Sequence, residues 1–324
     1  KLGLLALVVW GVHHSLFSAW QKLEEHHWNL SQWHPGWLVA GGLLYLAGQF
    51  PWAVFWWRVL RVLGQPSGLF ESLRAWYIGQ LGKYVPGKAM VIVLRAGMLR
   101  AGGATAAAAT VAVFFETLTT MSIGAALAAI VIAVRFPSER WLLAIAIGLW
   151  AVVSGPTTLP VFRRLARMGA GRFDPAMAER LVDLRYGTLL RSWFEIGVGW
   201  VLVGGSVWTT LVASGYADAT NWFDEWCICT AAAALSVVGG FLLFVPGGLL
   251  IRESALFEIL TPWFGDEGAL IAAIASRLVW IIAELLIAAI GFAARTRRTR
   301  DELEPKVDGM EQKATKETKF IKGP

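Results

Sequence analysis

Apolar runs of about 20 residues recur along this chain, and they constrain its fold more than any other feature. The core of a bilayer offers no hydrogen-bond partners to the backbone, so a chain that crosses it forms helices or a closed barrel. Each run is long enough for one helical crossing. Apolar residues make up 56% of the sequence and charged residues only 16%, which fits the same class. We therefore predict an all-α polytopic membrane protein.

We expect six full crossings. They are the runs 2–20, 37–63, 104–134, 141–161, 193–213 and 268–294. The intervening segments alternate in charge: residues 162–191 and 295–300 are basic, whereas residues 214–225 hold no lysine or arginine. Because basic segments stay on the cytoplasmic side, this pattern places both termini in the cytoplasm, in a bacterial-type inner membrane.

Two apolar runs are interrupted by Val-Pro-Gly, once within residues 84–88 and once within residues 244–253. Proline removes a backbone donor, and glycine leaves the backbone unshielded. In hydrocarbon such a break is tolerated only where it is buried in protein or lines a wet cavity. The number of crossings between the charged segments requires residues 70–100 to enter and leave the membrane on the cytoplasmic side, and residues 226–263 to enter and leave it on the outer side. We therefore predict that each of these segments is a re-entrant hairpin. A full crossing and return of residues 226–263 is the alternative.

The two hairpins suggest an inverted repeat over residues 37–161 and 186–295. Pro86 lies 30 residues before Glu116, and Pro246 lies 31 residues before Arg277. Transporters use repeats of this kind, with the site where broken helices meet near the midplane. We expect residues 1–295 to form one membrane transport domain. Residues 296–324 are charged and poor in apolar side chains, so we expect a disordered cytoplasmic tail.

Charges at membrane depth are the candidate site residues, because a charge in hydrocarbon costs about 3 kcal/mol or more and therefore pairs or lines a pathway. The candidates are Lys83, Lys88, Arg95, Glu116, Glu195, Arg252, Glu253, Arg277 and Glu284. Of these we expect all but Glu195 and Glu284 to bind the substrate. The breaks themselves are Pro86-Gly87 and Pro246-Gly247-Gly248. Helices that restart after them point their N-termini at the site, which favours an anion, and arginine forks match phosphate.

We therefore predict a pocket for a phosphate carried on a lipid, in which Arg95 and Arg252 hold the phosphate in turn. The alternative is that Glu116, Arg252, Glu253 and Arg277 only pair structurally. The basic segment 162–191 allows two interpretations: it binds anionic lipid headgroups, or its charges only set the orientation of the chain in the membrane. No nucleotide loop, nucleophile elbow or metal pair is present, so we expect no enzyme activity, cofactor, metal site or nucleic-acid partner.

Segments around both breaks resemble the lysylphosphatidylglycerol synthase transmembrane-region family. The resemblance is carried by Tyr77-Ile78-Gly79, Lys83-Tyr84-Val85-Pro86-Gly87-Lys88, Arg95-Ala96, Val245-Pro246-Gly247-Gly248 and Arg252-Glu253-Ser254-Ala255. It covers most of residues 1–295, and Pro-Gly-Gly followed by Arg-Glu is its most specific part. The resemblance implies a flippase-like domain that moves aminoacylated phosphatidylglycerol between leaflets, with relatives linked to hopanoid, glycolipid and polyprenyl-lipid pathways.

We expect a stand-alone member without the soluble synthase domain of the bifunctional proteins. The leading hypothesis is a flippase or scramblase for an anionic or zwitterionic phospholipid headgroup, or for a polyprenyl or glycolipid phosphate. The alternative is a non-transporting, lipid-binding membrane scaffold for a lipid-modifying enzyme. The expected partners are accordingly a phosphate-bearing lipid and, under the alternative, a lipid-synthesising enzyme.

Overall fold

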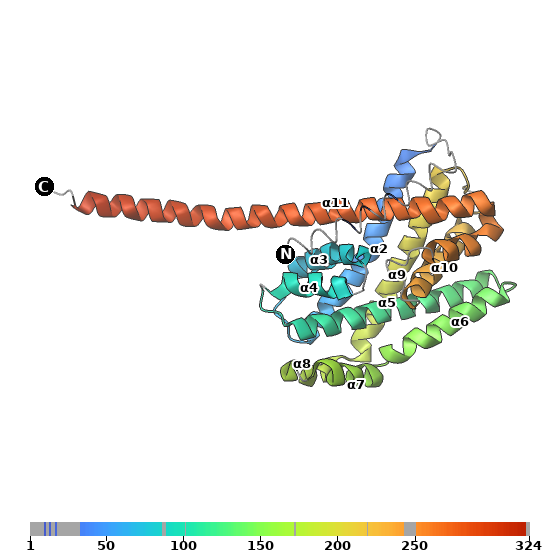
Figure 1. Cartoon of the computed structure of the whole chain (residues 1–324), viewed down its shortest axis with the longest axis horizontal. Coiled ribbons are helices and arrows are strands. Elements are labelled where there is room, and N and C mark those ends of the chain that lie inside the picture. Colours follow the sequence, from blue (N-terminus) through green and yellow to red (C-terminus); the bar gives the residue numbers. More distant parts are fainter. Residues whose placement is uncertain are drawn as a thin grey trace.

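The computed structural model describes residues 33–85, 89–100, 102–171, 173–218, 220–242 and 251–321, together with Trp10, His13 and Phe17 (Figure 1). For residues 170, 188, 251 and 295–321 it describes the backbone alone. Throughout these ranges the regular elements are helices, and none is a strand. The prediction of an all-α chain is therefore confirmed for the described residues.

Helices α2, Pro35–Val62, and α9, Tyr186–Ala213, form the most extensive helix pair among the described elements. They cross where Gly48 faces Gly199. A Cβ atom placed on Gly48 would lie 2.6 Å from the Gly199 carbonyl oxygen, and one on Gly199 would meet the Gly48 carbonyl oxygen. Two glycines facing each other thus let the two backbones touch, as small residues do between membrane helices.

Helix α5, Ala106–Arg135, packs against α6, Arg140–Ser154, as an antiparallel pair of spans. The sequence predicts a fourth span to residue 161 with a kink at Gly155-Pro156; the position of the kink is confirmed, but the span ends there and does not reach residue 161. A short 3-10 turn, Gly155–Thr157, interrupts the helix, and α7, Leu159–Ala170, begins as a separate element. The extended backbone of Thr158 and the missing N–H of Pro156 stop the first helix.

The first predicted hairpin consists of α3, Leu69–Gln80, a 3-10 turn, Leu81–Tyr84, and α4, Ala89–Arg100. Its two α-helices pack on each other. Each has 12 residues, about 18 Å of helix, against a hydrocarbon core of about 30 Å. Neither arm is therefore long enough to cross a membrane, which agrees with the re-entrant interpretation without establishing it.

The second predicted hairpin involves α10, Trp222–Leu242, and the first part of α11, Ile251–Ile321. Gly265 has a φ of 69° and a ψ of 173°, so α11 bends there into two helices. With 21 residues of mostly apolar character, α10 is itself long enough to cross. The backbone of α11 runs on to Ile321 along the segment for which the sequence predicts disorder (Figure 1), and that disorder stays a prediction.

Six described helices are long and apolar enough to span a membrane: Pro35–Val62, Ala106–Arg135, Arg140–Thr157, Leu189–Ala213, Trp222–Leu242 and Arg252–Ala294. The chain is therefore a multi-pass membrane protein. Five of these helices correspond to the predicted spans that begin at residues 37, 104, 141, 193 and 268, with ends that differ by up to four residues except at the start of the last. The sixth, α10, was expected as one arm of a hairpin, whereas the predicted span 2–20 lies almost entirely outside the described residues. The two re-entrant hairpins and the inverted repeat stay predictions.

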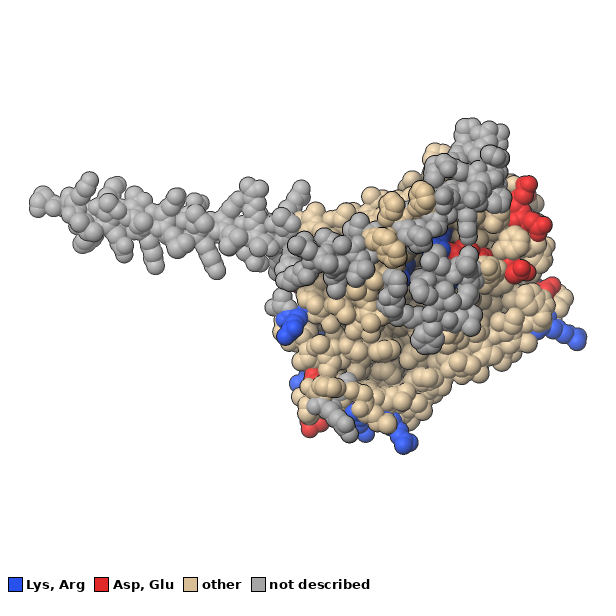
Figure 2. Space-filling model, viewed as in Figure 1, with Lys and Arg blue, Asp and Glu red and all other residues tan. Residues whose placement is uncertain are grey.

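On the face shown in Figure 2, charged side chains gather at two ends of the helix bundle. Acidic residues lie where α10 begins, at Asp224, and beside the bend of α11, at Asp266 and Glu267. The opposite end carries α7 and α8, Pro175–Arg180, whose arginines are Arg163, Arg164, Arg167 and Arg180. Asp174 caps α8 by accepting a 2.9 Å hydrogen bond from the Met177 amide. We call these the acidic end and the basic end.

Candidate functional site

A small internal cavity lies between the first hairpin and both parts of α11. Its volume is about 30 Å³. Five of the residues that line it are charged or phenolic: Lys83, Tyr84, Arg252, Glu253 and Arg277; Leu256, Ala273 and Trp280 complete the wall. Four of the predicted site residues, from two segments more than 150 residues apart in the sequence, thus surround one cavity. We call this the charged cavity.

Glu284 is the centre of the hydrogen-bond network beside the charged cavity, and its side chain is fully buried. It forms an ion pair with Lys83 and accepts a hydrogen bond from the Tyr45 hydroxyl. The Tyr84 hydroxyl donates to its second oxygen at 2.9 Å, and Gln49 donates a longer bond of 3.4 Å. The Glu284 carboxylate therefore connects α2, the turn of the first hairpin and the long part of α11.

Glu253 and Arg277 form the second ion pair of the cavity. They lie on the two parts of α11, before and after the bend at Gly265. Their side chains are 13% and 17% exposed, so the pair is largely withdrawn from solvent. Among the described residues, the other carboxylate oxygen of Glu253, Oε2, is buried without a hydrogen-bond partner. A buried acceptor left unpaired is costly, which marks this oxygen as a position that a ligand donor would fill.

Arg252 differs from the other two cations of the cavity, because no carboxylate of the described residues lies within 4 Å of it. Its guanidinium lies over the Trp280 ring, 5.4 Å from the centroid. The Trp280 ring stacks on Tyr45 at 4.7 Å, and its indole N–H donates to Ser206 at 2.9 Å. The arginine is thus held at the cavity by an aromatic face, which positions a cation without neutralising it.

The charge balance of the cavity and its neighbour Glu284 is positive. Three cations, Lys83, Arg252 and Arg277, face two carboxylates, Glu253 and Glu284. An unmatched cation at membrane depth is expensive unless an anion joins it. Guanidinium groups also bind phosphate oxygens in a geometry that few other side chains provide. The described part of the site is therefore suited to a phosphate or carboxylate group.

Arg95 and Glu116 lie apart from the charged cavity and bind each other. Their ion pair is 2.9 Å long, and both side chains are buried. The Arg95 guanidinium also lies over Trp56 and Trp76, 5.2 and 4.8 Å from the ring centroids. This arrangement gives the Arg95 charge an internal partner, while its Nε is buried without a hydrogen-bond partner among the described residues. Its predicted role as a ligand for phosphate stays a prediction, and the structure does not bring it to Arg252.

The remaining predicted site residues lie outside the described residues: Pro86, Gly87, Lys88, Pro246, Gly247 and Gly248. The segments that contain them nevertheless adjoin the cavity in sequence. Lys83 and Tyr84 end the turn just before the first segment, and Arg252 and Glu253 begin the helix just after the second. The charged cavity is thus built at the described borders of both breaks.

Three residues of the site were not predicted from the sequence: Tyr45, Gln49 and Trp280. Glu284 was predicted as a charge at membrane depth but was not assigned to the substrate site. Glu284 offered a signal, because it follows Arg277 by seven residues and hence lies two helical turns along the same face. Nothing distinguished Tyr45 or Trp280 from other aromatic residues of the spans. In the described part of the chain no group of three or more His, Cys, Asp and Glu side chains is placed to hold a metal ion.

Comparison with known proteins identifies one family. The family model described as the lysylphosphatidylglycerol synthase TM region matches residues 2–288 of the chain. Neither the curated proteins nor the solved structures gave a match.

Proposed function

Because the chain belongs to the lysylphosphatidylglycerol synthase TM-region family, we propose that it moves a phosphate-bearing lipid headgroup between the leaflets of a membrane. The headgroup is anionic or zwitterionic, and the lipid chains stay in the bilayer. The observation that carries the proposal is the charged cavity, which gathers an excess of cations between the borders of two broken segments.

Arg252 is the first contact for the headgroup phosphate in this proposal. Its guanidinium already faces the cavity and is not neutralised by a described carboxylate. Arg277 and Lys83 supply the further donors once the phosphate competes with their carboxylate partners. Glu253 Oε2 accepts a hydrogen bond from a hydroxyl or ammonium group of the headgroup, which satisfies that buried oxygen.

A volume of about 30 Å³ holds about one water molecule, so the conformation described here is closed to a headgroup. Passage requires the cavity to open, and two ion pairs oppose opening from different sides. The Lys83–Glu284 pair ties the first hairpin to α11, and the Glu253–Arg277 pair ties the two parts of α11 together. We infer that a phosphate weakens each pair by offering its cation another anion, and that the pairs re-form behind it.

The orientation of the chain follows from its charged ends. The basic end lies in the cytoplasm and the acidic end outside, as the positive-inside rule requires for a bacterial inner membrane. With this orientation, the two hairpins reach the site from opposite faces of the membrane, so that the site can open to each leaflet in turn.

Purified protein in liposomes tests this function with a fluorescent phosphatidylglycerol and a quencher added to one side. We expect wild-type protein to make the inner-leaflet lipid accessible, and Arg252→Ala to slow this by about thirtyfold, the effect of about 2 kcal/mol from a lost charge-assisted hydrogen bond. Arg252→Lys keeps the charge but not the fork, so its rate should fall between the two. Arg100→Ala, which removes an exposed arginine at the end of α4, is the matched control.

The small volume of the cavity favours a second candidate, a lipid-binding scaffold for a lipid-modifying enzyme, because a binding site need not open to both faces. Under this function Arg252→Ala lowers the amount of phospholipid that co-purifies with the protein, while the wild-type protein itself moves no lipid. A wild-type translocation rate equal to that of protein-free liposomes would therefore rule out transport and leave the scaffold.

A further inference from the structure

Helix α7 carries three distinct faces at the basic end of the bundle. Leu159, Phe162 and Ala166 are buried, and the Phe162 ring packs on Phe115 of α5 with centroids 4.2 Å apart. Two other faces are open: one is apolar and one is basic. Each open face of α7 is therefore a candidate contact surface, the apolar face for apolar groups and the basic face for anions.

The open apolar face consists of Val161, Leu165 and Met168, which are 44%, 51% and 69% exposed. Their spacing of four and three residues puts them on one stripe. The same kind of exposure runs along the preceding span, where Ile145 and Val152 are 46% and 61% exposed. Because α6 is a membrane-spanning helix, its exposed apolar side chains face lipid chains. The stripe on α7 continues that lipid-facing surface past the break at Pro156.

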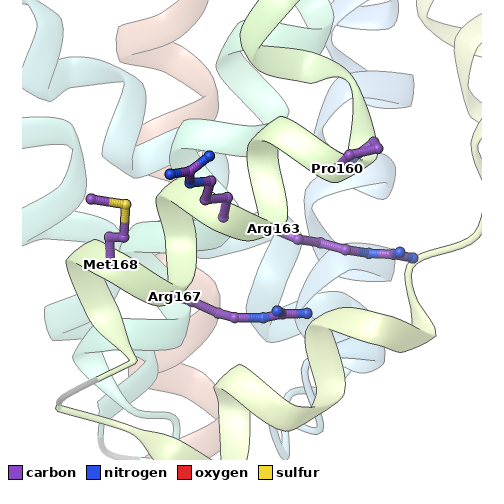
Figure 3. Close-up of a pocket in the computed structure, with 5 residues that line it drawn as sticks. Pro160, Arg163, Arg167 and Met168 are labelled. Carbon is purple, nitrogen blue, oxygen red and sulfur yellow. The ribbon is translucent and has the colours of Figure 1, made fainter.

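The basic face borders a shallow groove of about 620 Å³, which is lined by Pro160, Arg163, Arg164, Arg167 and Met168 (Figure 3). Arg163 and Arg167 extend to the same side of α7, and Met168 points away from them. Arg163 is used by the fold: it donates 3.0 Å hydrogen bonds to the carbonyls of Leu181 and Val182 and a further one to Leu184. It thereby fixes the segment that follows α8 against α7.

Arg164 and Arg167 are exposed, and within the described chain neither side chain makes an ion pair or a hydrogen bond. Three residues apart, they lie on one side of the helix. Two free guanidinium groups beside an exposed apolar stripe match a phospholipid, whose phosphate meets the arginines while its chains lie along the stripe.

We propose that α7 is a second lipid site, separate from the charged cavity, which holds an anionic phospholipid of the leaflet at the basic end. The phosphate binds between Arg164 and Arg167, and the acyl chains lie on Val161, Leu165 and Met168. The lipid remains in its leaflet, so this site does not depend on transport. The competing explanation is that the two arginines only orient the chain during insertion.

Full-length protein in a neutral detergent, titrated with short-chain phosphatidylglycerol, phosphatidylcholine or potassium phosphate, tests the proposal. Bound lipid is counted by native mass spectrometry, and thermal unfolding is followed by tryptophan fluorescence. For Arg164→Gln/Arg167→Gln we expect the affinity of one phosphatidylglycerol to fall about thirtyfold, about 2 kcal/mol for two charges at a lipid surface. Phosphatidylcholine binding should be unchanged.

Arg100→Gln/Arg140→Gln removes the same charge from two exposed arginines on α4 and α6 and is the control. It should change the affinity less than threefold. Arg252→Ala should retain the α7 lipid, which separates this site from the cavity. Should the α7 double variant fail to fold, Leu165→Gln keeps both charges and is still expected to weaken the lipid but not inorganic phosphate.

Two outcomes would overturn the proposal. Wild-type affinity in Arg164→Gln/Arg167→Gln would leave the arginines with topology alone; where Leu165→Gln replaces that variant, wild-type affinity would show that no lipid chain lies on the apolar stripe. Equal stabilisation of the wild-type protein by potassium phosphate and by phosphatidylglycerol would show a site for free anions instead of a lipid.

Discussion

Lys83 and Glu284, 201 residues apart in the sequence, form an ion pair that joins the turn of the first hairpin to the middle of the last span. Glu284 is fully buried, whereas the Lys83 side chain is 27% exposed toward the charged cavity. The pair is therefore both a tie between two segments of the fold and one wall of the site. Its two roles can be separated by substitution.

Glu284→Leu should destabilise the protein by about 3–5 kcal/mol, because it leaves the Lys83 ammonium without its carboxylate. Lys83→Met should do the same by leaving the Glu284 charge buried. The double variant restores only part of the stability: an apolar pair replaces the ion pair at little cost, but the Tyr45 and Tyr84 hydroxyls lose their acceptor. Thermal unfolding gives the stabilities. If the double variant is stable and also translocates lipid at the wild-type rate, Lys83 has no part in passage.

The Arg95–Glu116 pair lies apart from the charged cavity, so we expect it to contribute to stability and not to lipid passage. Arg95→Met alone should cost about 3–5 kcal/mol, because Glu116 is buried and has lost its cation. Arg95→Met/Glu116→Leu should recover most of that loss and keep lipid translocation within about threefold of wild type, less than 1 kcal/mol in barrier. A double variant that is stable in thermal unfolding but inactive in liposomes would instead give Arg95 a direct contact with the substrate.

Gly82 holds the arms of the first hairpin in close contact. A Cβ atom there would lie 2.6 Å from the Val91 amide nitrogen of α4, so Gly82→Ala must push the arms apart. We expect a loss of about 1–3 kcal/mol, as for overpacking in a tight core. Gly97→Ala in the same hairpin is the control, because nothing lies within 4 Å of its Cβ. That change should be neutral or stabilise α4 by up to about 1 kcal/mol. Equal unfolding temperatures for the two variants would contradict the close contact.

The orientation of the chain is tested by single cysteines in a background without Cys227 and Cys229. Arg180→Cys at the basic end and Asp266→Cys at the acidic end both place the thiol at an exposed position. In intact cells a membrane-impermeant maleimide should label residue 266 and leave residue 180 unlabelled until the membrane is opened. Labelling of both from outside would contradict the proposed topology.

The sequence predicts the spans well because apolar length is a local property. The runs that begin at residues 37 and 104 became α2 and α5 with ends that differ by a few residues. The fourth span failed at one end because Pro156 completes a break there, after which α7 packs as its own helix. Hydropathy alone does not distinguish a kink from a break, since both leave the run apolar.

The site was predictable where charge and helix break coincide. Lys83, Arg252 and Glu253 adjoin the interruptions in the chain, and the structure places them around one cavity. Which buried charges pair is a different matter, because pairing depends on how distant helices pack. Glu116 binds Arg95 at 2.9 Å, and nothing in its sequence position selects that partner over the arginines of the second half.

The contact between Gly48 and Gly199 limits how the bundle can rearrange. With no side chains between them, α2 and α9 cannot move closer at this point. Beside the crossing, the Trp52 indole donates to the Ile196 carbonyl and packs on Trp200, and further along Arg58 pairs with Glu195, so contacts on both sides oppose a turn of one helix on the other. A conformational change that opens the charged cavity should therefore keep α2 and α9 together as one unit and move the elements around them.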